Sequence, residues 1–226
     1  YHSIYDSFDY FTRFADPNFD YGIALAQTTG RAILRLADAD VLPFEFTGFA
    51  DAVEKYVGEV AKLTDDLREE TKETNRLLRE KMFEAAADPK QTYVAPEPKS
   101  DVPYLNFAPL QNALAKLQES VRKFDSARKQ AEERTPASAE ARQALDSVLM
   151  KMEQTLTRPE GLPRRQWYQH MIYAPGFYTG YGVKTLPGVR EAIEQRNWTE
   201  AAAQIDVAAQ TIEKYAAGID HARELL

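Results

Sequence analysis

The amino-acid sequence predicts an all-α fold: an antiparallel, four-helix-bundle-like domain in which a long aromatic loop, rich in glycine and proline, precedes the last helices. Apolar residues recur every three or four positions in four or five separate stretches, and polar or proline-rich connections divide these stretches. No segment alternates apolar and polar residues convincingly enough to predict a strand. Together these observations favour helices packed on helices.

The first two helices follow from the apolar spacing. Pro17 precedes a helical pattern that stops before Leu42-Pro43, which predicts a first helix over about 18–39. A second helix, long and highly charged, is expected from Thr47 and weakens toward Ala85. Its apolar residues advance by three and four positions: Phe49, Val53, Tyr56, Val60, Leu63 and Leu67.

A proline-rich insertion is expected next, over about 87–109. Prolines recur throughout this stretch, so it cannot be one continuous helix and is interpreted as an exposed connection. The third helix then carries apolar residues at helical spacing: Leu110, Leu114, Leu117, Val121 and Phe124.

The fourth helix has clear signals at both ends. Ser138 and Glu140, after Pro136, are typical of a helix start, and Thr157-Arg158-Pro159 is expected to end the helix. Between these signals the apolar positions are Leu145, Val148, Leu149, Met152 and Leu156.

Residues 159–188 break the helical pattern. Glycine and proline recur through this stretch, and six aromatic residues lie among them: Trp167, Tyr168, Tyr173, Phe177, Tyr178 and Tyr181. Loops of this length inside compact domains are usually functional or packed against another body. After the loop, Thr199 is expected to cap a last helix with apolar residues Ile205, Ala208, Ile212, Tyr215, Ala216 and Ile219.

Composition excludes several classes of function. The 226 residues carry a net charge of −7, and the basic residues form no stripe, so a nucleic-acid partner is not expected. No apolar run approaches the ~20 residues needed to span a bilayer, so no membrane segment is expected in this chain. The absence of cysteine excludes disulfides and thiolate zinc sites but does not decide the compartment.

A Tyr1-His2 pair opens the chain, and no other catalytic constellation follows it. A reactive pair is seldom placed at a frayed terminus, so we interpret the chain as a C-terminal fragment. Taken alone, a single histidine is more often structural than a metal ligand. His170 and His221 do not complete a ligand set by spacing; His170 is expected to pack and His221 to be exposed.

Several ordered motifs together resemble the glutamate carboxypeptidase II family. They run along nearly the whole chain: Tyr1-His2-Ser3-Ile4-Tyr5-Asp6, Phe14-Ala15-Asp16-Pro17, Leu42-Pro43-Phe44, Gly161-Leu162-Pro163, His170-Met171-Ile172-Tyr173-Ala174-Pro175 and Leu186-Pro187-Gly188. The resemblance implies that residues 1–16 are the tail end of a zinc peptidase domain. Residues 17–226 would then form the transferrin-receptor-like helical dimerisation domain, with about 70–105 resembling an insertion.

The resemblance also implies roles for the first two residues. His2 matches the last ligand of a two-zinc site whose other ligands come from the preceding peptidase domain, so this chain would supply one ligand only. Neutral imidazole suits Zn²⁺. Tyr1 matches the catalytic tyrosine that donates its hydroxyl to the oxyanion formed during attack on the peptide bond.

Substrate recognition is implied in the aromatic loop. The family places a lysine and a tyrosine there on the carboxylate of a C-terminal glutamate. Tyr181 keeps the tyrosine, whereas Gly180 stands where the lysine would be. Loss of this charged contact weakens the expectation of glutamate preference, and Lys184 is not expected to replace the missing lysine.

Our first functional hypothesis is therefore a homodimerisation domain of a two-zinc exopeptidase that acts on peptides, completing the active site but not catalysing alone. The preceding peptidase domain and a second copy of the chain would be its partners. The alternative is a non-catalytic transferrin-receptor-like receptor or sorting adaptor in which the Tyr1-His2 pair is a relic. A third hypothesis is a helical interaction module that shares only the fold. The resemblance implies a membrane-anchored parent whose enzyme domain lies on the extracellular, luminal or vacuolar side.

Overall fold

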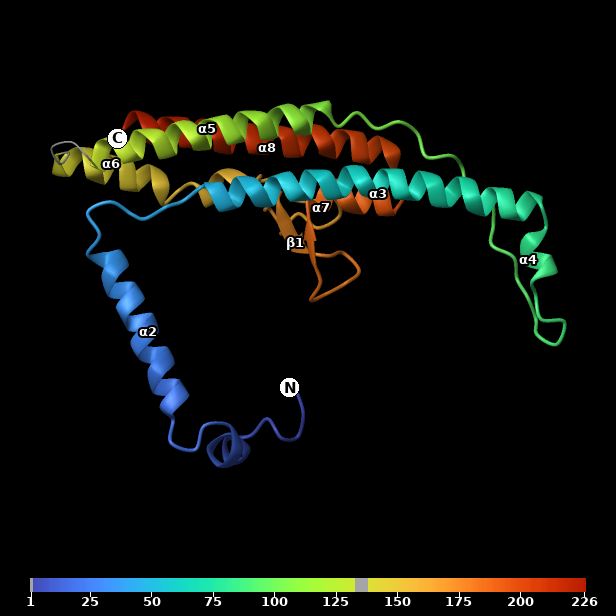
Figure 1. The fold of residues 1–226 in the computed structure, drawn as a ribbon, viewed down its shortest axis with the longest axis horizontal. Helices are drawn as coiled ribbons and strands as arrows, with labels where there is room; N and C mark the ends of the chain where they lie inside the picture. The colour runs from blue at the N-terminus through green and yellow to red at the C-terminus, as the bar shows by residue number, and fades with distance from the viewer. Residues whose placement is uncertain (1, 133–137) are drawn as a thin grey trace. The chain divides into compact units, whose positions relative to one another are not determined.

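The computed structural model describes residues 2–132 and 138–226, and the chain divides into two compact units, Tyr1–Phe44 and Glu45–Leu226. The all-α prediction is confirmed: helices make up most of both units, with one small hairpin in the second (Figure 1). Pro136, expected just before the fourth helix, lies outside the described residues. The expected boundary after residue 16 concerns a peptidase domain and stays a prediction.

The first unit contains a short helix α1 (Phe8–Tyr10), a π-helical turn η1 (Phe11–Ala15) and the longer helix α2 (Asp20–Ala37). The buried carboxylate of Asp16 accepts hydrogen bonds from the backbone N–H groups of Tyr21 (3.3 Å) and Gly22 (2.9 Å), which satisfies the start of α2. None of the residues of α2, all of which the structure describes, is buried. Its apolar face therefore has little packing within this unit.

The second unit is built on four main helices: α3 (Thr47–Arg79), α5 (Ala108–Glu132), α6 (Ala139–Leu149) and α8 (Trp198–Glu224). Successive members of this set reverse direction, so α3 and α5 are antiparallel whereas α5 and α8 run the same way side by side (Figure 1). A short helix α4 (Met82–Ala85) follows α3, and a 3-10 turn η2 (Glu153–Leu156) follows α6.

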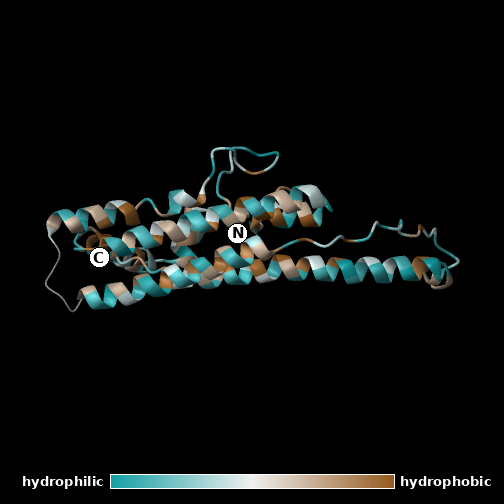
Figure 2. Cartoon of the chain, turned by 90° about the horizontal axis from the view of Figure 1, so that it is seen from above, coloured by the Kyte–Doolittle hydropathy of each residue, from teal (hydrophilic) through white to brown (hydrophobic). Residues whose placement is uncertain are grey.

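The core follows the predicted apolar stripes closely in the later helices. In α8, every residue of the predicted stripe from Ile205 to Ile219 is buried. In α3, the buried stripe is shifted, because Phe49 and Tyr56 lie half-buried at its edge. The buried α3 positions are Ala50, Val53, Val57, Val60, Thr64 and Thr71. Toward its end α3 is mostly hydrophilic (Figure 2).

The proline-rich stretch is exposed only in part. Residues 88–101 are exposed, but Val102 and Leu105 are buried, and α5 already begins at Ala108. Asn75 of α3 anchors this return path, because its side chain donates to the carbonyl of Lys99 (2.7 Å) and accepts from the N–H of Lys99 (3.1 Å). The last part of the stretch thus packs back on α3 instead of forming a free loop.

Residues 159–188 contain more regular structure than the sequence indicates. Strands β1 (Tyr173–Pro175) and β2 (Val183–Thr185) form an antiparallel hairpin, although no strand was expected. Helix α7 (Pro187–Glu194) begins where the loop was expected to end, because proline suits the first turn of a helix. Asn197, not Thr199, caps α8, since its side chain accepts from the N–H of Glu200.

Candidate functional site: the loop at the end of the hairpin

The loop over residues 176–182 joins β1 to β2 and holds the two residues to which a substrate role was assigned. Tyr181 is 93% exposed, so its ring and hydroxyl are available to a ligand. Gly180 adopts a left-handed backbone conformation with φ +57. Among the described residues, no heavy atom lies within 4 Å of the position that a Cβ would take at Gly180.

The loop is closed by a compact turn around Thr179. The N–H of Gly176 donates to the carbonyl of Gly182 (2.8 Å), and the hydroxyl of Thr179 donates to the same carbonyl (2.9 Å). A Cβ on Gly176 would stand 2.1 Å from Oγ1 of Thr179, so a larger residue there would displace the Thr179 side chain. Tyr181 is therefore presented by a tight turn and not by an extended chain.

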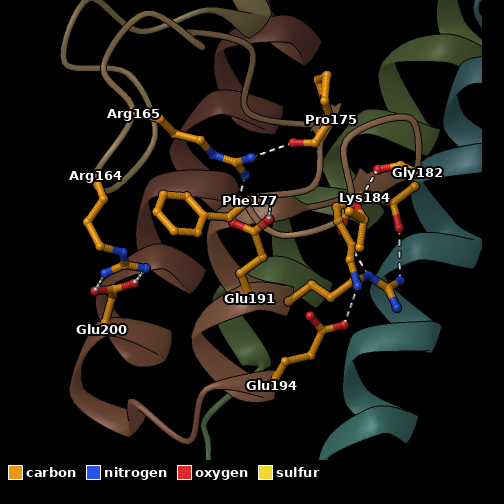
Figure 3. Close-up of polar contacts among 12 residues, drawn as sticks. Arg164, Arg165, Pro175, Phe177, Gly182, Lys184, Glu191, Glu194 and Glu200 are labelled. Carbon is orange, nitrogen blue, oxygen red and sulfur yellow. Dashed lines mark hydrogen bonds and ion pairs between the residues drawn. The ribbon is translucent and has the colours of Figure 1, made fainter.

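A buried ion pair lies under the base of this loop. Arg165 and Glu191 are joined at 2.6 Å, and their side chains are only 3% and 8% exposed. Arg165 also donates to the carbonyl of Pro175, while the other carboxylate oxygen of Glu191 accepts from the N–H of Phe177 at 2.8 Å. Figure 3 shows these contacts converging on the start of the loop. Neither residue is predicted from the sequence, since nothing in their spacing marks them as a pair.

Three other basic side chains around the loop are each paired with a carboxylate. Arg164 binds Glu200 through two hydrogen bonds of 2.7 and 2.9 Å, which raise the pKa of Arg164. Lys184 contacts Glu194 at 2.7 Å (Figure 3). Arg190 contacts Glu59 of α3 at 2.7 Å. The positive charge of Lys184 is thus already balanced by Glu194.

A second polar cluster, formed by Glu153, His170 and Tyr173, lies at the start of β1. Nδ1 of His170 accepts from the backbone N–H groups of Ile172 (3.3 Å) and Tyr173 (3.2 Å), while its Nε2 faces Glu153 at 3.1 Å. Burial lowers the pKa of His170, outweighing the opposite effect of Glu153. The hydrogen bond from the Tyr173 hydroxyl to Glu153 (2.5 Å) raises the pKa of Tyr173 to about 12. His170 is therefore a packed, hydrogen-bonded residue, as expected.

The expected metal and catalytic residues belong to the other unit. Tyr1 lies outside the described residues. His2 is exposed and has φ 52. Within residues 2–132 and 138–226, no group of three or more His, Asp or Glu side chains is placed so that it could hold a metal ion. In the same described part, no helix has the length and apolar character needed to cross a membrane.

Part of the sequence matches a known protein family. Residues 105–220, just over half of the chain, match the family model of the transferrin receptor-like dimerisation domain. This match covers α5, α6, the hairpin, α7 and most of α8. The loop with Gly180 and Tyr181 therefore lies inside the matched domain.

Curated relatives extend the similarity over the whole chain. A probable glutamate carboxypeptidase of Arthroderma benhamiae is 28% identical over 219 residues, covering 97% of this chain and 25% of the relative. A probable glutamate carboxypeptidase of Arabidopsis thaliana is 29% identical over 226 residues, covering 100% and 27%. An aminopeptidase of Rattus norvegicus is 22% identical over 233 residues, covering 100% and 26%.

The chain spans about a quarter of the length of these relatives. The helical fold and the matched domain both agree with this similarity. The chain belongs to the glutamate carboxypeptidase II-like family and contains its transferrin receptor-like dimerisation domain.

Proposed function

We propose that this chain is the homodimerisation domain of a two-zinc exopeptidase and completes the active site of that enzyme. The observation that carries the proposal is the match of residues 105–220 to a dimerisation domain within a chain whose whole length resembles peptidases. In a homodimer the same surface of each copy would face the other, which is the usual arrangement of two-fold oligomers.

The first unit supports a preceding peptidase domain as the second partner. Its large apolar side chains are widely exposed, among them Phe8 (74%), Phe14 (70%), Leu25 (69%) and Leu34 (70%). Exposed apolar side chains gathered on one small unit are typical of a surface that another body covers. The relatives are about four times as long as this chain, so a peptidase domain of the parent is a suitable occupant.

Zinc is the cofactor that we propose for the parent. The neutral imidazole of His2 is a suitable zinc ligand, and the remaining ligands would come from the peptidase domain. Bound zinc would supply Lewis-acid polarisation of the peptide carbonyl. Tyr1 would then donate its hydroxyl to the oxygen on which negative charge develops.

Tyr181 is the proposed substrate contact. Its 93% exposed side chain stands on a compact turn, which lowers the entropy lost when a ligand orders it. Gly180 offers no charge, and Lys184 is paired with Glu194, so the loop favours a peptide contact through the tyrosine over one through an ammonium group. Peptide is thus the proposed substrate class, without a preference for C-terminal glutamate from this loop.

Static light scattering tests the dimerisation directly. The mass of the purified chain is measured over a concentration series, once with zinc and once with a chelator. We expect a dimer that the chelator does not change. A monomer at every concentration would contradict an autonomous dimerisation domain, and assembly that requires zinc would show metal ligation between copies, contrary to the role given to His2.

Metal analysis tests the proposed ligand in the intact parent enzyme. We expect His2→Ala to lose bound zinc, whereas His221→Ala, which changes an exposed histidine on α8, keeps the wild-type content. Equal zinc content in the two variants would exclude His2 as a ligand. This readout does not depend on catalytic activity.

A further inference from the structure

The buried pair of Arg165 and Glu191 is unusual because its remaining hydrogen bonds are directed to one short piece of backbone. Arg165 donates to the carbonyl of Pro175, the last residue of β1, and Glu191 accepts from the N–H of Phe177. These two backbone groups flank Gly176, where the loop begins. The pair thus holds the chain on both sides of the first loop residue (Figure 3).

Aromatic rings complete the enclosure of Arg165. Its guanidinium lies 5.5 Å from the ring centroid of Tyr168 and 5.8 Å from that of Phe177. Phe177 is therefore held through its N–H by Glu191 and through its ring by Arg165 and by Arg164, whose guanidinium also lies 5.8 Å from the ring centroid. Since Phe177 is the second residue of the loop, its position sets the direction in which the loop leaves the strand.

Stability alone is a poor explanation for this pair. Removing two charges from water is costly, and a buried ion pair is often no better than apolar residues of similar size. Nε of Arg165 is also buried and, among the described residues, has no hydrogen-bond partner, which adds to the cost. An apolar pair could not donate to the carbonyl of Pro175 or accept from the N–H of Phe177.

We propose that Arg165 and Glu191 are positioning residues that set the orientation of the 176–182 loop and thereby of Tyr181. The tight turn around Thr179 joins the base of the loop to its tip, because Gly176 and Thr179 both bond the carbonyl of Gly182. A shift at Phe177 is thus transmitted to Tyr181. Its consequence for substrate binding rests on the proposed function.

The decisive variant replaces both members, Arg165→Met with Glu191→Leu. Replacing a buried pair by apolar residues usually preserves folding, whereas removing one partner leaves an unpaired buried charge. The double variant therefore separates positioning from stability. The control is Arg164→Gln with Glu200→Gln. It removes the neighbouring, more exposed ion pair and the contact of Arg164 with the Phe177 ring (5.8 Å to the centroid) but leaves the bonds of Arg165 and Glu191 to the loop backbone, so it tests whether those backbone bonds hold the loop.

Amide hydrogen exchange of the 226-residue chain is the first readout. We expect the N–H groups of Gly176 and Phe177 to exchange at least about tenfold faster in the double variant, with exchange in α8 unchanged, and no change at either amide in the control. Unchanged exchange at both amides in a folded double variant would overturn the proposal. General loss of protection, including α8, would equally overturn it, because the pair would then be structural.

Kinetics of the intact parent enzyme separate this inference from the proposed function. If Tyr181 contacts peptide, the double variant should raise KM severalfold with a smaller change in kcat, which is the pattern of lost binding. Tyr181→Phe is measured beside it to test the contact itself. Faster exchange with an unchanged KM in both variants would uphold the positioning of the loop and overturn the substrate role of Tyr181.

Discussion

Helix α8 and the segment over residues 157–186 lie in the same unit but are stabilised differently. Helix α8 buries ten residues, and all of them except Thr211 are apolar or aromatic. The 157–186 segment also buries apolar residues, among them Leu162, Ile172 and Leu186, but it adds side chains that bond distant polar groups: Arg165 to Glu191, and His170 and Tyr173 to Glu153. Apolar burial tolerates small shifts because it has no direction, whereas hydrogen bonds fix orientation.

This difference indicates that the two regions have different roles. The helix supplies stability through area removed from water, and the segment supplies a defined loop geometry at some cost in desolvation. We therefore expect α8 to respond to changes in side-chain volume. The segment should respond to changes in charge and hydrogen bonding.

The largest effect is expected from truncation in α8. Ile212 is fully buried, so Ile212→Ala should lower the free energy of unfolding by about 2–5 kcal/mol, as buried aliphatic truncations do. Urea titration followed by circular dichroism measures it. A loss below about 1 kcal/mol would mean that burial in α8 does not contribute more to stability than the 157–186 segment does.

A smaller effect is expected at the polar cluster under β1. Tyr173→Phe removes the hydroxyl that donates to Glu153 but keeps the ring, which lies 4.1 Å from His170 between centroids. Because Tyr173 is 44% exposed, we expect a loss of only about 0.5–1 kcal/mol. The same urea titration gives the value. A loss as large as that of Ile212→Ala would show that the segment is as important for stability as α8.

The pH dependence of stability should come partly from His170. Its pKa is lowered in the folded chain, so unfolding takes up a proton below the ordinary histidine value of about 6.5. The stabilisation is therefore complete above about pH 6.5 and decreases as the pH falls toward the lower folded pKa. Thermal unfolding at pH 7.5, 6.5 and 5.5 would reveal it.

His170→Asn is the control for this pH effect. Its side-chain oxygen can accept from the N–H groups of Ile172 and Tyr173 but does not titrate in this range. The variant should lose less stability than the wild type between pH 7.5 and 5.5. An equal loss in both proteins would assign the pH dependence to other groups and leave the segment no more sensitive to charge than α8.

The sequence predicted the helices better than the segment for the same physical reason. Apolar residues at helical spacing, such as the Ile205–Ile219 stripe, determine a buried face through local periodicity. The contact between Arg165 and Glu191 joins residues far apart along the chain, so no short pattern indicates it. Pro187 lay within the stretch of 159–188 that was expected to break the helical pattern, but the first turn of a helix is a position that proline favours.

The candidate site could be predicted only as positions, not as geometry. The resemblance identified Gly180 and Tyr181, and the structure places both on one exposed turn. It could not indicate that Lys184 is paired with Glu194, because that contact depends on how β2 and α7 pack together. Charge pairing between separate elements therefore has to come from the three-dimensional structure.

The smallest effect is expected from the same isoleucine-to-alanine change in α2. Ile33 is 60% exposed, so Ile33→Ala should change the stability of this chain by no more than about 0.5 kcal/mol, measured by the same urea titration as Ile212→Ala. In the intact parent, a peptidase domain covering α2 would bury Ile33, and the same substitution should then cost more, because burial determines the cost of truncation. If Ile33→Ala hardly changes the free energy of unfolding in either protein, the peptidase domain does not cover the apolar face of α2. A cost in this chain comparable to that of Ile212→Ala would show instead that α2 packs within the chain as α8 does.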